Sequence, residues 1–137
     1  MKRGSLILLT AFLLSYGSDE LFRAVLTKNE QAVIKLLNKG ADVNARDEDG
    51  YTPLHYAVYM RSPKLVELLL ERGADPNAQD NRGRTPLHIA VLVKSEELVK
   101  LLLKHGAKKD VKDEEGMTPY DYARERAYKN LAQLLKE

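Results

Sequence analysis

The sequence contains no cysteine and no tryptophan among its 137 residues. Without cysteine the chain cannot form disulfide bonds, thiolate metal sites or thiol nucleophiles. It has only seven tyrosines and two phenylalanines, so its core must be mostly aliphatic. Neither a glycine-rich phosphate-binding loop nor a Gly-x-Ser-x-Gly nucleophile elbow occurs in it. Several common sequence signatures of catalysis are therefore absent.

The chain also lacks a strong excess of charge of one sign. Its formal net charge is +2, with 22 basic and 20 acidic residues. Lys2 and Arg3 account for this excess, because every acidic residue lies from Asp19 onward and the remaining 20 basic residues match the acids. Nucleic-acid-binding domains usually concentrate positive charge on one face. The composition therefore predicts no nucleic acid partner.

Short motifs recur along the chain with a step of 33 residues. Thr-Pro-Leu-His occupies residues 52–55 and 85–88, and it returns as Thr-Pro-Tyr-Asp at residues 118–121. A Gly-Ala pair, each time after a leucine-rich segment, begins at residues 40, 73 and 106. Several independent motifs that share one period indicate an array of structural repeats.

These motifs resemble the ankyrin repeat, in which a Thr-Pro-Leu-His helix start and a Gly-Ala-Asp loop are typical. The resemblance covers residues 18–137. It implies an all-α fold, an ankyrin-repeat solenoid of stacked helix-turn-helix units with hairpin loops, and a role in binding another protein without catalysis. The expected units, of which the first and last are incomplete, are residues 18–49, 50–82, 83–115 and 116–137.

Each Thr-Pro pair is typical of a helix start. The threonine hydroxyl can accept a hydrogen bond from an amide of the first turn, and proline at the first helical position loses nothing through its missing N–H. A turn and a second helix should follow, and the turns carry Arg61 and Lys94 where the family usually has glycine, which predicts slight backbone strain. The expected helices span residues 53–60, 63–71, 86–93, 96–104, 119–126 and 129–136.

The histidines and aspartates that could suggest a reactive site recur at the same period. His55 and His88 are 33 residues apart, as are the loop aspartates Asp47, Asp80 and Asp113. Groups at equivalent places in successive repeats form rows and do not converge on one reacting centre. We expect no catalytic residue, no metal site and no cofactor, and the resemblance implies that each histidine bonds the backbone of a neighbouring loop.

The first seventeen residues have the pattern of a secretory signal peptide. A basic start precedes an apolar run at residues 6–14, which is too short for a membrane-spanning helix of about twenty residues. Ser15 and Gly17 then place small side chains where a signal peptidase cleaves. We expect cleavage after Gly17 and a periplasmic or secreted protein. The alternatives are an extra helix packed on the first repeat of a cytoplasmic protein, and an uncleaved signal that acts as a weak membrane anchor.

The resemblance implies that partners bind to the loop tips and to the exposed ends of the first helices, which line a concave side. Apolar residues occupy these helix ends in three units, at sites where we expect no packing role within the stack. Exposed apolar area commonly marks an interaction surface. The alternative is that Leu92 and Val93 partly tuck under neighbouring loops. The candidate partner-binding residues are Arg46, Tyr51, Tyr59, Met60, Arg82, Arg84, Leu92, Val93 and Met117.

Two functions remain open from the sequence. The first is an exported small adaptor or partner-binding protein that is monomeric and uses its concave face to hold another protein. The second is a structural or stress-related protein that associates with copies of itself and has no separate client. The sequence names no partner, because repeat proteins recognise partners through an assembled surface.

Overall fold

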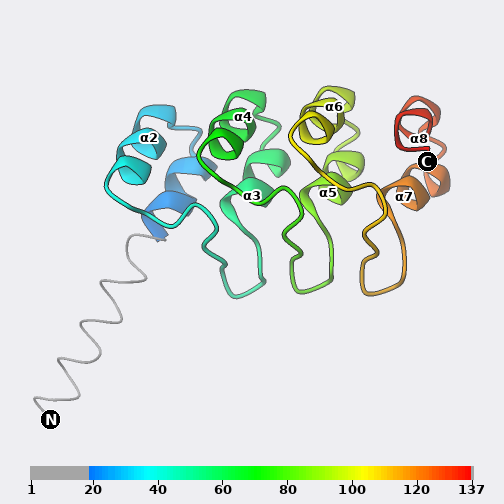
Figure 1. The fold of residues 1–137 in the computed structure, drawn as a ribbon, viewed down its shortest axis with the longest axis horizontal. Coiled ribbons are helices and arrows are strands. Elements are labelled where there is room, and N and C mark those ends of the chain that lie inside the picture. Colours follow the sequence, from blue (N-terminus) through cyan, green and yellow to red (C-terminus); the bar gives the residue numbers. More distant parts are fainter. Residues whose placement is uncertain (1–18, 137) are drawn as a thin grey trace, which may run out of the picture.

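The computed structural model describes residues 19–136, so the expected signal peptide lies outside the described part of the chain. All regular structure within that part is helical, and the helices form two rows (Figure 1). Residues 19–26 are helical and precede α2 (Glu30–Asn38). The remaining helices are α3 (Pro53–Tyr59), α4 (Pro63–Glu71), α5 (Pro86–Leu92), α6 (Glu96–Lys104), α7 (Pro119–Glu125) and α8 (Lys129–Leu135).

The helices form stacked pairs, as the repeat pattern predicts. Within a unit α3 packs on α4, α5 on α6 and α7 on α8. Between units α3 packs on α5 and α5 on α7, while α4 packs on α6 and α6 on α8. Long loops join one pair to the next and project on the side of α3, α5 and α7 (Figure 1). The predicted solenoid of helix-turn-helix units is therefore confirmed, with helix ends within one residue of those expected.

The helix starts are fixed by local hydrogen bonds. Thr52 precedes α3, and its hydroxyl accepts a hydrogen bond from the amide of His55 at 3.3 Å. In return, Nδ1 of His55 accepts a hydrogen bond from the amide of Thr52 at 3.1 Å. Two orphan amides of the helix end are thereby satisfied by each other's side chains. The same reciprocal cap starts α5 at Thr85 and α7 at Thr118.

The core runs along the stack as a continuous aliphatic layer. Leu65, Leu69 and Leu102 are fully or almost fully buried, and so are Val66 and Val99. These side chains lie on α4 and α6, which pack against each other. One helix pair alone could not cover its apolar face, so the stability of each unit depends on its neighbours. No helix in residues 19–136 is long and apolar enough to cross a bilayer.

The turns between paired helices are strained, as expected. Arg61 has φ of 54° and Lys94 has φ of 55°, and the equivalent positions Lys28 and Ala127 have φ of 54° and 57°. These values lie in the left-handed region, where a side chain costs about 1–2 kcal/mol that glycine would avoid. All four turns bear this cost.

Candidate functional site

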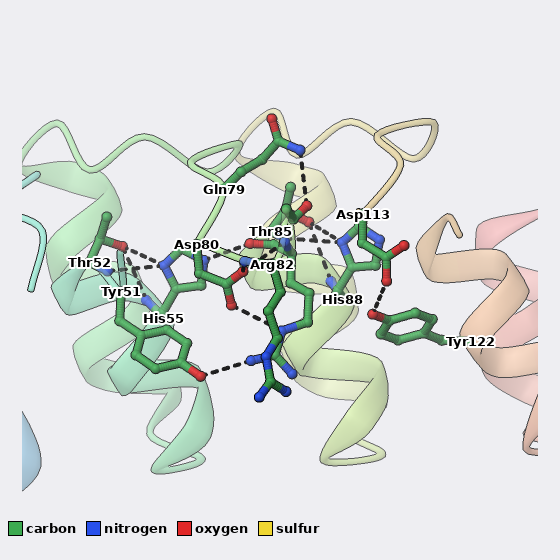
Figure 2. Close-up of polar contacts among 12 residues, drawn as sticks. Tyr51, Thr52, His55, Gln79, Asp80, Arg82, Thr85, His88, Asp113 and Tyr122 are labelled. Atoms are coloured by element: carbon green, nitrogen blue, oxygen red, sulfur yellow. Dashed lines mark hydrogen bonds and ion pairs between the residues drawn. The ribbon is translucent and has the colours of Figure 1, made fainter. Parts of the chain in front are cut away.

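The two repeated histidines hold each unit to the following one. Nε2 of His55 lies 2.9 Å from the carbonyl oxygen of Arg84, and Nε2 of His88 lies 2.9 Å from that of Met117 (Figure 2). Because Nδ1 of each ring already accepts an amide hydrogen bond, the proton must reside on Nε2, which donates to the carbonyl. The predicted structural role of these histidines is confirmed.

Burial favours the neutral form of both histidines. Both rings are fully buried. Burial lowers the pKa of His55 and of His88 below the ordinary value of 6.5, and the hydrogen bond to the carbonyl offsets only part of that effect. Among residues 19–136 no group of three or more histidine or acidic side chains is arranged to hold a metal ion. The rings act as links between units.

The loop aspartates form a second row beside the histidines. One oxygen of Asp80 accepts hydrogen bonds from the amides of Arg82 and Arg84, each at 2.9 Å. Asp47 and Asp113 hold their own loops in the same way. Such contacts close a turn around the carboxylate. The interpretation of these residues as turn formers is therefore confirmed.

The second oxygen of the outer two aspartates accepts a hydrogen bond that the sequence analysis missed. The hydroxyl of Tyr56 donates to Asp47, and that of Tyr122 donates to Asp113. Burial raises the pKa of each tyrosine, and the adjacent carboxylate raises it further. Burial alone would raise the pKa of Asp113, but the hydrogen bonds from Tyr122 and from two loop amides outweigh it and lower that pKa.

The middle aspartate has a different partner because the tyrosine is replaced there by Ile89. Nε of Arg84 lies 3.0 Å from the second oxygen of Asp80, and their side chains are only 12% and 1% exposed. The same guanidinium donates from Nη2 to the hydroxyl of Tyr51 at 2.8 Å (Figure 2). A buried carboxylate requires such a partner. Arg84, near the start of its unit, thereby bonds two residues of the preceding unit.

Tyr51 and two neighbouring tyrosines form an aromatic cluster next to this ion pair. The ring of Tyr51 meets that of Tyr59 edge to face, with centroids 5.8 Å apart, and that of Tyr56 at 5.4 Å. Burial, together with the Tyr51 hydroxyl, raises the pKa of Tyr59 to about 12. The structure therefore brings together Tyr51, Tyr59 and Arg84, which are three of the candidate residues.

The expectation that the apolar helix ends have no packing role is wrong for the ends of α3 and α5. Tyr59, Leu92 and Val93 are half-buried and pack against the core. The reason is that these side chains lie at the ends of α3 and α5, which pack against each other and against α4, α6 and α7. The alternative that Leu92 and Val93 tuck in is therefore nearer to the structure. Among the described residues, the large apolar side chain that is clearly exposed is Leu26, at 43%.

The remaining candidate residues lie along the loops and at one helix end. Nη2 of Arg46 donates to the carbonyl of Gln79 in the following loop at 2.7 Å, although its side chain is exposed. Arg82 is exposed at a loop tip, while Met60 and Met117 are half-buried. The candidate residues thus occupy one side of the stack, but several of them also hold the units together.

A comparison with protein families identifies this architecture. The family described as ankyrin repeats (many copies) matches residues 36–90 and, one repeat further on, residues 69–123. The two matches together cover more than half of the chain and are displaced from each other by the 33-residue period. Ankyrin repeats generally mediate protein–protein interaction and are typically not catalytic. The chain belongs to the ankyrin repeat family.

Proposed function

We propose that this chain is an exported, non-catalytic adaptor that holds another protein against the side of the stack bearing the loops and the first helices. We call this the candidate surface. It consists of the nine predicted residues Arg46, Tyr51, Tyr59, Met60, Arg82, Arg84, Leu92, Val93 and Met117.

The observation that carries this proposal is the interlocked group of Tyr51, Tyr59 and Arg84. Tyrosine, methionine and arginine are enriched where proteins bind each other. The Asp80 carboxylate and the Tyr51 hydroxyl hold the guanidinium of Arg84 in place. A surface that is already ordered loses less conformational entropy when a partner binds. The half-buried positions of Leu92 and Val93 reduce their contact area but keep them rigid.

Binding rather than catalysis is supported by how the polar residues are used. His55 and His88 each have both ring nitrogens engaged, and the loop aspartates are bonded through both carboxylate oxygens. A general acid or base needs a proton within reach of a substrate. The histidines and loop aspartates form their hydrogen bonds with other residues of the fold.

The proposal can be tested with matched double variants in the same unit. Tyr59→Ala with Met60→Ala alters the candidate surface, whereas Lys64→Ala with Glu67→Ala alters exposed residues of α4 in the other row of helices. We expect capture of a partner from native extract to persist in the α4 variant. In the surface variant the free energy of binding should weaken by about 2 kcal/mol, which is typical of truncating a central interface residue. Equal capture by both variants would show that the partner binds outside the candidate surface.

The export part of the proposal rests on the first seventeen residues, with their basic start, apolar run and small residues at the cleavage positions. Mass spectrometry of the protein made in its native host tests it. A mature chain that begins at Ser18 supports export, and one that retains Met1 refutes it.

Analytical ultracentrifugation tests whether the chain binds a separate partner or associates with copies of itself. A monomer at micromolar concentration supports a separate client. A dimer or larger assembly that the Tyr59→Ala, Met60→Ala variant abolishes supports the structural alternative.

A further inference from the structure

The tips of the three hairpin loops present a row of alternating charge. Asp49, Arg82 and Glu115 stand at equivalent positions, one in each loop, and all three are exposed. Glu48 and Glu114 add a second acidic side chain to the outer two tips. Within residues 19–136 none of these five side chains forms an ion pair. The row therefore offers acidic, basic and acidic groups that are free to pair with another molecule.

Direct bonds between neighbouring tips hold the backbone that carries these charges. The amide of Asn81 donates to the carbonyl of Asp49 at 3.0 Å, and the amide of Glu114 donates to the carbonyl of Arg82 at 2.8 Å. The side-chain amide of Asn81 also donates to the carbonyl of Glu48 at 2.8 Å. The three tips thus form one connected edge.

The loops approach so closely that glycine is needed beside two of the tips. A Cβ atom on Gly50 would lie 2.8 Å from the backbone nitrogen of Asn81, and one on Gly83 would lie 2.9 Å from that of Glu114. Both glycines also have positive φ, of 79° and 77°. The backbone contact and the conformation therefore both favour glycine there.

The spacing of the row matches one type of polypeptide. Equivalent residues of adjacent units are separated by one step of the stack, which for packed helices is about 10 Å. A polyproline II segment has three residues per turn and rises about 3.1 Å per residue, so residues i and i+3 lie on one face about 9 Å apart. Such segments dock on aromatic surfaces, and Tyr51 stands two residues from Asp49 with its ring against Tyr59.

We propose that the hairpin-tip row binds a proline-rich, extended segment of the partner protein with the pattern basic-x-x-acidic-x-x-basic. The two basic groups pair with the outer tips and the acidic group pairs with Arg82, while the residues between the first basic group and the acidic group lie on the side of Tyr51. The inference rests on the proposed binding function and names the chemistry of the partner.

A second copy of this chain is a poor occupant of the same edge. In a two-fold symmetric contact centred on the row, Arg82 would face Arg82 and the acidic tips would face acidic tips, because such an interface uses the same patch twice. Like charges placed opposite each other repel. The charge pattern thus favours a different protein as the occupant.

The test compares two capped synthetic peptides that differ only in charge order. One is Lys-Pro-Pro-Asp-Pro-Pro-Lys and the other is Asp-Pro-Pro-Lys-Pro-Pro-Asp, and binding to the full chain is followed by NMR titration of backbone amides. We expect the first peptide to bind about tenfold more tightly at low salt, since each exposed ion pair contributes a factor of up to about five. The net charge of +2 would by itself favour the second peptide. The preference should fade in about 0.5 M salt, which screens exposed charges.

Variants then locate the effect. Combining Glu48→Gln, Asp49→Lys, Arg82→Asp, Glu114→Gln and Glu115→Lys should invert the preference, whereas Arg61→Gly, which removes a basic charge at the other end of α3, should leave it unchanged. Absence of binding by both peptides, equal binding, or an order that survives the charge reversal would overturn the proposal. The capture experiment with Tyr59 and Met60 can still succeed in that case, so the two failures are distinguishable.

Discussion

Two different substitutions of His88 can separate the two structural roles of the repeated histidine, which are to cap its own helix and to bond the next loop. Nδ1 of the ring accepts from the amide of Thr85, which starts α5, and Nε2 donates to the carbonyl of Met117 in the next loop. Asparagine can replace the first contact with its side-chain oxygen, as Asp121 does in the last unit, but it is too short for the second. Alanine replaces neither.

The expected losses of stability follow from the contacts that each substitution removes. In His88→Asn, the Met117 carbonyl keeps the hydrogen bond from the amide of Asp113 and loses the one from His88, which costs about 0.5–1.5 kcal/mol in the free energy of unfolding. In His88→Ala, loss of the cap contact adds about 1 kcal/mol, and the empty ring volume adds a cavity term. We therefore expect alanine to be worse than asparagine by at least about 1 kcal/mol.

The assay is equilibrium unfolding in urea, followed by circular dichroism at about pH 8, where the histidines of both folded and unfolded chains are neutral. Tyr120→Ala serves as a control, because this half-buried side chain lies in the last unit and contacts neither His88 nor Met117 through a hydrogen bond. Equal stability of wild type and His88→Asn would refute the link between units. Equal stability of the asparagine and alanine variants would refute the capping role.

Three further predictions concern stability. Leu69→Ala should lower the free energy of unfolding by about 2–5 kcal/mol, because the side chain is fully buried; a loss below about 1 kcal/mol in a urea melt would contradict its place in the core. Burial lowers the pKa of His55 and His88 in the folded chain, so the unfolded chain binds more protons below about pH 6.5 and the free energy of unfolding should fall there. A plot of the free energy of unfolding against pH between about 6.5 and 5 should be less steep for His55→Asn than for wild type. Equal steepness would show that the buried ring does not cause the pH dependence. Arg61→Gly should raise stability by about 0.5–1 kcal/mol, since it relieves the left-handed backbone at a smaller entropic cost; a lower thermal midpoint would count against strain at that turn.

The sequence predicted the repeat architecture well because the signals for it are local. Thr52 followed by Pro53 specifies a helix start within three residues, and the same chemistry recurs one period later at Thr85. Once each unit has the same local instructions, stacking follows from the need to cover its apolar face. The helix ends could be placed to within one residue for this reason.

The candidate surface was harder to predict because its contacts link different units. The sequence does not show that Arg84 turns toward Asp80 and Tyr51, since this depends on Ile89 standing where the neighbouring units have tyrosine. A signal was available, because an aspartate is followed nine residues later by tyrosine in two loops and by isoleucine in the third. Its meaning required knowledge of which side chains are close in space.

The direction of the histidine contacts gives the array a polarity. Each buried ring reaches forward along the chain, so His88 depends on the unit that follows it, while α3 and its cap depend on no histidine before them. Trimming the chain back to residue 115 would leave an imidazole N–H of His88 without its acceptor, whereas removing the first helix pair would strand none. Loss of structure under stress should therefore progress differently from the two ends, and a duplicated copy of residues 83–115 inserted after residue 115 would offer His88 the carbonyl of a second Arg84 as its acceptor, as His55 has in the native chain.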